Sequence, residues 1–239
     1  MTTGPDGANA RTLAAYEQRA TVYRDRTGHR SVPAIDAMVK AVSEDSPPGE
    51  ILEIGSAHGR DALTIESRGR TVRRTDATVA FVQMLREQGH RADVLNVLTD
   101  ELTNDEHPTY AAVLANAVFL HFTPAELAVV LTKVRAALTE DGLLAFSVKR
   151  GDGSEWSDHK LGVPRFFQYW QPEPLAEHVE AAGLTVRDLA VDPANPREWV
   201  RVVARAAFRR GMRPDRPRGI ASRDRSAHDR RVLAAGQCR

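Results

Sequence analysis

The spacing of apolar residues changes between two periods along this chain. From residue 50 to residue 208, short apolar runs alternate with segments in which apolar residues recur every three or four positions. The runs predict strands at 51–54, 71–76, 92–95, 110–117, 143–148, 184–191 and 199–208, and the other segments predict helices at 60–67, 79–88, 124–138 and 173–182. Strands separated by helices favour a parallel sheet with right-handed crossovers, and the 192–196 turn favours a final hairpin.

Two helical patterns precede this alternation. Within residues 9–26, Leu13, Tyr16, Ala20 and Tyr23 follow one another at spacings of 3, 4 and 3, which places them on one face of a helix. The second pattern follows Pro33 and stops at the 46–49 turn. We expect residues 1–48 to form a helical lid and residues 49–208 to form the α/β core.

The alternation breaks at residues 150–170, which are rich in aromatic side chains and are predicted to form a long loop. Loops of this length inside a compact domain are uncommon and usually functional. Flat apolar walls with a few donors suit an aromatic or amide-bearing small molecule. The predicted substrate-binding residues are Phe119, Trp156, His159, Arg165, Phe166, Phe167, Tyr169 and Trp170. Because Phe166 and Phe167 are adjacent, we expect at least one of them to be structural.

Charge is distributed unevenly. Residues 209–239 hold ten arginines and three aspartates, a net charge of +7, whereas the rest of the chain carries −6. An acidic body argues against a nucleic-acid clamp, and the tail has the composition of a solvated, disordered segment, although it could bind polyanions by itself. Cys238 is the single cysteine, so disulfides and cysteine-based metal sites are excluded, and we expect no metal. No apolar stretch approaches the ~20 residues of a membrane span and no secretory signal is present, so we expect a cytoplasmic protein.

The strongest chemical signal lies where the first strand meets the next helix. There the chain reads Glu-Ile-Gly-Ser-Ala-His-Gly-Arg-Asp over residues 53–61. Gly55 and Gly59 permit a sharp turn and the close approach of backbone to a ligand. The helix amino end offers unpaired N–H groups and positive potential, which suit a carboxylate or a phosphate.

Two features argue against a nicotinamide cofactor at this turn. The glycine spacing is Gly-x-x-x-Gly rather than Gly-x-Gly-x-x-Gly, and Glu53 would repel a pyrophosphate. A carboxylate there would instead favour a sulfonium with an α-ammonium group. Asp76 and Asp93 end the next two strands, where they can accept hydrogen bonds from ribose hydroxyls and from the adenine amino group. We expect the three acids to converge on one adenosyl sulfonium.

These segments, with YAAVLANAVFLHFTPAELAVVLTKVRAALTEDGLLAFSVKRG, resemble the class I S-adenosylmethionine-dependent methyltransferases over about residues 10–208. The resemblance implies a Rossmann-like α/β fold with a seven-stranded, mostly parallel sheet, a terminal antiparallel hairpin and an N-terminal helical lid. It implies S-adenosylmethionine as cofactor and S-adenosylhomocysteine as product. The implied cofactor-binding residues are Tyr16, Glu53, Gly55, Ser56, Ala57, Gly59, Arg60, Asp76, Ala77, Asp93, Val94, Ala115 and Asn116. Ala57 departs from the family's usual glycine, although alanine still permits close approach.

The segment GDGSEWSDHKLGVPRFFQYW resembles a narrower bacterial group, some of which methylate indole C3 in tryptophan-containing cyclic dipeptides and give a pyrroloindoline. This resemblance implies a small-molecule acceptor in bacterial secondary metabolism. Tyr23 and His121 are the candidate general bases, although Tyr16 and Tyr23 could belong to the helix's core stripe and His121 could be a packed residue.

Three alternatives stay open from the sequence alone. One is an RNA methyltransferase, or another O- or N-methyltransferase, with the arginine tail as an anchor in the RNA case. Another is a regulatory protein that binds S-adenosylmethionine without catalysis, and a dehydrogenase is disfavoured by the glycine spacing. The sequence is compatible with a monomer or a homodimer.

Overall fold

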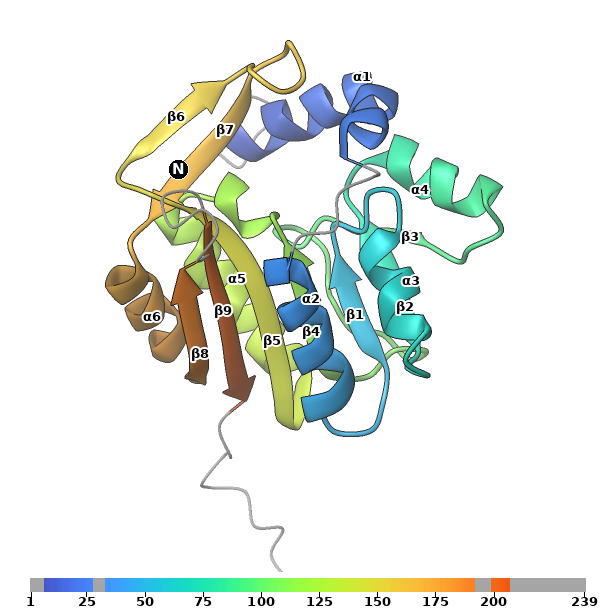
Figure 1. The fold of residues 1–239 in the computed structure, drawn as a ribbon, viewed down its shortest axis with the longest axis vertical. Coiled ribbons are helices and arrows are strands. Elements are labelled where there is room, and N and C mark those ends of the chain that lie inside the picture. Colours follow the sequence, from blue (N-terminus) through green and yellow to red (C-terminus); the bar gives the residue numbers. More distant parts are fainter. Residues whose placement is uncertain (1–6, 28–32, 192–198, 207–239) are drawn as a thin grey trace, which may run out of the picture. The chain divides into compact units, whose positions relative to one another are not determined.

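The computed structural model describes residues 7–27, 33–191 and 199–206, so the predicted basic tail lies outside the described residues. Figure 1 shows helices on both faces of a central sheet. The elements in chain order are α1 (Ala8–Thr27), α2 (Pro33–Lys40), η1 (Ala41–Asp45), β1 (Ile51–Ile54), α3 (Arg60–Glu66), β2 (Val72–Asp76), α4 (Val79–Glu87), β3 (Asp93–Val94), β4 (Tyr110–Asn116), η2 (Phe119–His121), α5 (Pro124–Ala137), β5 (Leu138–Arg150), β6 (Ser154–Ser157), β7 (Arg165–Trp170), α6 (Pro172–Ala181), β8 (Leu184–Val191) and β9 (Trp199–Ala206).

The sheet has the order β3-β2-β1-β4-β5-β7-β6, with β9 paired to β5 and β8 paired to β9. The pairs from β3 to β5 and the β5–β7 pair are parallel, whereas β9 runs antiparallel to both β5 and β8. The Rossmann-like class and the terminal hairpin are therefore confirmed. The strand order reverses between β1 and β4, and in such open sheets ligands bind at the carboxyl ends of the strands near this point.

The central strands are buried on both faces, so their residues divide between two cores. Alternate residues of β4 face opposite sides: Val113 packs with α5 and α6, whereas Ala112 and Leu114 pack with α2 and α3. This arrangement explains why the strand reads as a continuous apolar run rather than an alternating one.

The described residues form nine strands rather than the expected seven, because residues 150–170 do not form the long loop that we predicted. They form the antiparallel β6–β7 hairpin, and β7 joins the sheet through the pairs Lys149–Tyr169 and Arg150–Trp170. Figure 1 shows this hairpin beside α1, beyond the carboxyl ends of the strands. The aromatic residues that suggested a ligand pocket therefore follow the alternation of a strand.

The predicted lid also divides into two parts. α1 packs on β7, α4 and η2 at the carboxyl edge of the sheet, as a lid would. α2 and η1 instead cover one face of the sheet, where Met38, Val39 and Val42 are fully buried in the core. No helix within the described residues is long and apolar enough to cross a membrane.

Candidate functional site

The turn between β1 and α3 has a backbone that only small residues allow. The φ angle is 75° at Gly55, 47° at Ala57 and 82° at Gly59. A Cβ atom at Gly55 would lie 2.4 Å from Val118 Cγ2, and one at Gly59 would lie 2.7 Å from Leu85 Cδ2. At Gly55 and Gly59, both the backbone conformation and the lack of space for a Cβ atom thus favour glycine. Ala57 holds an unfavourable conformation of the kind that clusters at ligand sites.

Asp76, at the carboxyl end of β2, connects two of the loops around this turn. Its carboxylate accepts hydrogen bonds from the backbone N–H of Ala57 at 2.9 Å and from that of Thr78 at 2.8 Å. Burial raises the pKa of Asp76 to about 6. The carboxylate therefore lies at a fixed position where the β1 turn and the start of α4 meet.

These loops surround a cleft at the carboxyl edge of the sheet. Apolar side chains make up most of its walls, with a few convergent polar groups, which is the usual character of a small-molecule site. The residues that line it are Asn9, Thr12, Leu13, Tyr16, Tyr23, Ile54, Gly55, Ala57, Asp76, Ala77, Thr78, Phe81, Leu95, Asn96, Val97, Asn116, Ala117, Val118, His121 and Phe122.

Asn116 lies at the end of β4 with both ends of its amide bonded. Its Nδ2 donates to Asp61 Oδ2 at 2.8 Å, and its Oδ1 accepts from Ser147 Oγ at 2.8 Å. Asp61 also accepts from Arg60 Nε at 2.8 Å. Arg60 therefore supports Asn116 through Asp61, whereas Ala115 is fully buried and does not line the cleft.

Glu53 and Ser56 lie buried beside the turn and do not line the cleft. Glu53 is 3% exposed, and within the described residues neither its Oε2 nor Ser56 Oγ has a hydrogen-bond partner. Burial, followed by the charge of Asp61, raises the pKa of Glu53 to about 7. Unsatisfied buried polar atoms are uncommon in folded proteins. Their presence here marks the turn as a place with unused hydrogen-bonding capacity.

Tyr16 and His121 meet at the edge of the cleft. Tyr16 Oη lies 2.9 Å from His121 Nε2, and His121 Nδ1 lies 2.5 Å from the carbonyl oxygen of Phe166. Arg165 Nη1 donates to Tyr16 Oη at 3.0 Å. Burial, together with the positive charges of Arg165 and Lys149, lowers the pKa of His121 to about 3. Both ring nitrogens are thus engaged and the ring is neutral.

Tyr23 lines the same cleft about two helical turns beyond Tyr16 along α1. Its ring packs edge-on against Tyr16 at 5.4 Å and against Phe81 at 5.6 Å. Burial raises the pKa of its phenol. The two residues predicted as general bases therefore both resist the protonation change that this role requires near neutral pH.

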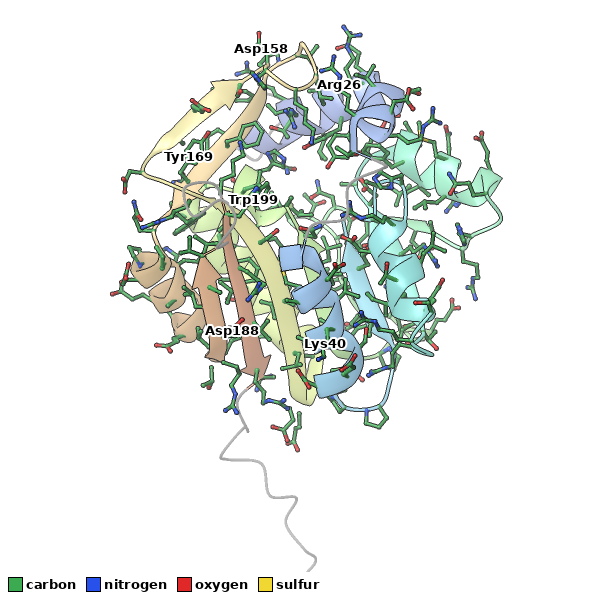
Figure 2. The ribbon with its side chains drawn as sticks, in the orientation of Figure 1. Arg26, Lys40, Asp158, Tyr169, Asp188 and Trp199 are labelled. Atoms are coloured by element: carbon green, nitrogen blue, oxygen red, sulfur yellow. The ribbon has the colours of Figure 1, made fainter. Side chains whose placement is uncertain are left out.

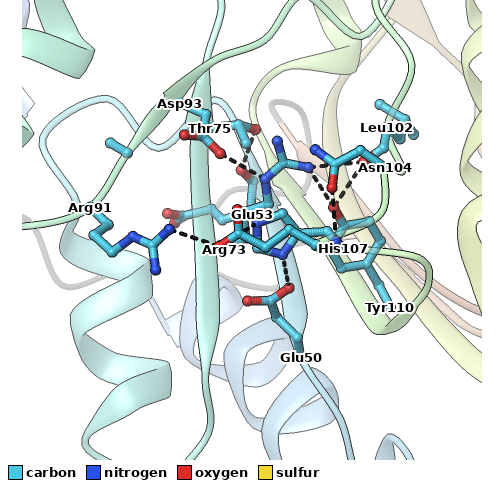
Figure 3. A network of polar contacts seen from close by, with 12 residues as sticks. Glu50, Glu53, Arg73, Thr75, Arg91, Asp93, Leu102, Asn104, His107 and Tyr110 are labelled. Carbon is cyan, nitrogen blue, oxygen red and sulfur yellow. Dashed lines mark hydrogen bonds and ion pairs between the residues drawn. The ribbon is translucent and has the colours of Figure 1, made fainter.

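Asp93 does not reach the cleft, so the expected convergence of three acids is not met. In the register of β2 and β3, Asp93 lies opposite Thr75, which places its side chain on the face of Arg73 rather than that of Asp76. There it accepts from Arg73 Nε at 2.8 Å, in a network with Tyr110 and Leu102 (Figure 3). Val94 is 48% exposed and is likewise not part of the cleft wall. Residues 95–97 occupy the place predicted for this pair.

None of the predicted substrate-binding side chains lines the cleft. Phe119, Phe167 and Trp170 belong to the main core, and Phe166 packs on Trp156, over which Arg11 lies at 4.0 Å. Both adjacent phenylalanines are thus structural. His159 is exposed, and Tyr169, labelled in Figure 2, donates from the hairpin to Glu155. The segment meets α1 through Arg26, which donates to the Lys160 carbonyl.

Comparison with known families identifies this arrangement. The profile of the methyltransferase domain family matches residues 26–189, which is more than half of the chain. The chain belongs to the methyltransferase domain family. Membership confirms the expected enzyme class, an S-adenosylmethionine-dependent methyltransferase, and the expected cofactor. A search of curated proteins finds no match.

Solved methyltransferase structures share the fold. The 1,6-didemethyltoxoflavin-N1-methyltransferase of Burkholderia thailandensis, with bound 1,6-didemethyltoxoflavin and S-adenosylhomocysteine, is 19% identical, with a TM-score of 0.66, covering 87% of this chain and 92% of that one. The magnesium protoporphyrin IX methyltransferase of Synechocystis, with bound S-adenosylmethionine, is 11% identical, with a TM-score of 0.66 and coverage of 87% and 100%. The CcbJ methyltransferase of Streptomyces caelestis is 17% identical, with a TM-score of 0.64 and coverage of 81% and 98%.

Sequence reasoning missed part of the cleft lining. Asn9, Thr12 and Leu13 line it from α1, and the first two were overlooked because the apolar spacing of that helix drew attention to its larger side chains. The polar positions 9, 12 and 16 recur at spacings of three and four, and this helical period is the signal that could have found them.

Proposed function

We propose that this protein binds S-adenosylmethionine in the cleft at the carboxyl edge of its sheet and transfers the methyl group to a small-molecule acceptor. The observation that carries the proposal is that the Gly55–Gly59 turn, the Asp76 carboxylate and the Asn116 amide open into one cleft. When bound, the cofactor supplies an electrophilic methyl group on a sulfonium.

The residues of the cleft fit an adenosyl sulfonium. Gly55 and Ala57 allow the backbone to approach the methionyl part, and the unsatisfied Glu53 and Ser56 lie beside them. Asp76 retains lone pairs for the ribose hydroxyls. Residues 95–97 would then border the adenine, in place of Asp93 and Val94.

The protein's part in the reaction is alignment and the exclusion of water. Asn116 is held rigidly by Asp61 and Ser147 beside the place proposed for the sulfonium. Tyr16, Tyr23 and Phe81 form an aromatic cluster that covers the cleft from α1 and α4. Because the His121 ring resists gaining a proton and the Tyr23 phenol resists losing one, we assign them positioning rather than general-base roles.

The narrower candidate acceptor is indole C3 of a tryptophan-containing cyclic dipeptide, a reaction of bacterial secondary metabolism. It is supported by the resemblance of residues 151–170. The packed state of the aromatic side chains in that segment gives it no further support.

Two measurements on the full chain test the proposal. Isothermal titration should show S-adenosylmethionine binding, with no comparable binding of a nicotinamide dinucleotide. Mass spectrometry of reactions with cyclic dipeptides, indoles, small amides and an RNA panel should show a gain of one methyl on a small molecule. Methyl transfer to RNA alone, or cofactor binding without any S-adenosylhomocysteine formation, would contradict the proposed function.

A further inference from the structure

Three elements bring polar side chains to one oxygen at the cleft. Tyr16 of α1 supplies the phenol, His121 of η2 lies 2.9 Å from it, and Arg165 of β7 lies 3.0 Å from it. Tyr16 and His121 line the cleft, whereas Arg165 is 4% exposed and has no carboxylate within ion-pair distance among the described residues. Because the buried His121 ring is neutral, the directions of these hydrogen bonds follow from which groups can donate and which can accept.

The His121 ring must carry its proton on Nδ1. The carbonyl oxygen of Phe166, 2.5 Å from Nδ1, can only accept, so Nδ1 must donate. A neutral imidazole has one donor nitrogen, which leaves Nε2 as an acceptor. Tyr16 must therefore donate its only proton to His121.

Two of the three hydrogen bonds that the Tyr16 hydroxyl can make are then assigned. A guanidinium has no acceptor, so Arg165 donates to one lone pair of Tyr16 Oη. The proton is committed to His121, and one lone pair is left. Tyr16 can therefore accept a hydrogen bond from a ligand in the cleft, but it cannot donate one.

We infer that Tyr16 faces the cleft as a hydrogen-bond acceptor of fixed polarity, with His121 and Arg165 as its positioning residues, and that the methyl acceptor meets it with a neutral N–H or O–H group. This inference rests on the proposed function. The guanidinium of Arg165 on the same oxygen disfavours a cationic donor such as the α-ammonium of the cofactor. Lys149 reinforces that field, because it flanks the Phe167 ring at 5.0 Å while Arg165 flanks it at 4.9 Å.

This arrangement makes Tyr16 a specificity-determining residue. A methyl acceptor that lacks the N–H or O–H group leaves the Tyr16 lone pair buried without a partner. Such a molecule gains no compensating contact from Arg165 or His121, whose hydrogen bonds to Tyr16 are already made. Leaving one such group unpaired lowers affinity by roughly tenfold or more.

The first test reads the tautomer of His121 directly, without any ligand. Long-range proton–nitrogen NMR of the full chain should show His121, identified by the signal lost in His121→Gln, with its proton on Nδ1 from pH 5 to pH 8. The usual tautomer in free histidine carries the proton on Nε2, so the two outcomes are distinct. A proton on Nε2, or a doubly protonated ring in this range, overturns the inference.

The second test uses indole and 1-methylindole as matched probes on protein saturated with S-adenosylhomocysteine. Wild-type protein should bind indole about tenfold more tightly. Tyr16→Phe should remove this preference, because the probe's N–H then has no hydrogen-bond acceptor. It should change the S-adenosylmethionine Kd by less than about threefold, because the other two hydrogen bonds that are lost, to His121 and from Arg165, do not involve the cofactor. Tyr169→Phe is the matched control, since that phenol donates to Glu155 on the hairpin.

The outcomes separate the inference from the proposed function. If indole shows no preference in the wild type, or if Tyr16→Phe weakens cofactor binding instead, Tyr16 does not select the acceptor and the inference fails. If S-adenosylmethionine does not bind the wild-type protein, the proposed function fails whatever the indole result.

Discussion

Gly55→Ala is the substitution whose effect the structure specifies most fully. The new methyl carbon would lie 2.4 Å from Val118 Cγ2, whereas carbon atoms in favourable contact lie about 3.5–4.0 Å apart. The backbone φ of 75° adds about 1–2 kcal/mol for any residue with a Cβ. Overpacking adds about 1–3 kcal/mol, so we expect the free energy of unfolding to fall by about 2–5 kcal/mol.

Gly69→Ala is the matched control for the backbone part of this effect. Gly69 has a φ of 78°, and a Cβ there would meet nothing within 4 Å. Gly69→Ala should therefore lower the free energy of unfolding by only about 1–2 kcal/mol, the cost of the left-handed conformation. Adding Val118→Ala to Gly55→Ala removes the clash, and the double variant should recover stability toward that of the Gly69 variant.

The assays are urea unfolding and isothermal titration with S-adenosylmethionine. Gly55→Ala should weaken the cofactor by about tenfold or more, because the turn can no longer approach the ligand, whereas Gly69→Ala should leave the affinity unchanged. The reasoning is refuted if Gly55→Ala is no less stable than Gly69→Ala, or if Val118→Ala gives no recovery.

Two further predictions concern the acids. Asp76→Asn should weaken S-adenosylmethionine binding by about tenfold, because hydrogen bonds to charged groups contribute about 1.5–3 kcal/mol. Asp93→Asn should change the Kd less than twofold and act only on stability. Equal effects of the two variants in titration would contradict the placement of Asp93 away from the cleft. The pKa of Glu53 is raised from 4.5 to about 7, so the folded chain keeps a proton that the unfolded chain releases. The free energy of unfolding should therefore fall as pH rises from 4.5 to 7, by about 3 kcal/mol relative to Glu53→Gln, and a flat difference in unfolding experiments would contradict this.

The fold could be predicted from the sequence wherever the apolar residues of a segment follow a single period, either that of a strand or that of a helix. The seven predicted strands and the order of strands and helices are all present, because apolar runs bounded by glycine and proline allow few alternatives. The turn at Gly55 and the acid at Asp76 were found for the same reason: backbone geometry at the end of a strand depends on neighbouring residues in the chain.

The position of Asp93 depends on information that local sequence does not contain. Successive residues of a strand face opposite sides, so a shift of one residue between β2 and β3 would exchange the face of Asp76 for the face of Arg73. Thr75 rather than Asp76 lies opposite Asp93, and this register is set by packing across the sheet. An acid at a strand end therefore predicts a ligand only when its register is known.

The hairpin at 154–170 shows how a segment can affect a site without lining it. Its aromatic side chains were predicted to bind the acceptor, yet Phe166 contributes its backbone carbonyl and Arg165 contributes one N–H group. Pairing of β7 with the end of β5 is what brings both groups to His121 and Tyr16. Every residue has a backbone carbonyl, and Arg165 acts through Tyr16. The residue types in this segment therefore could not reveal its effect on the cleft. The polarity of the cleft is thus decided by the register of a strand that the cleft does not touch.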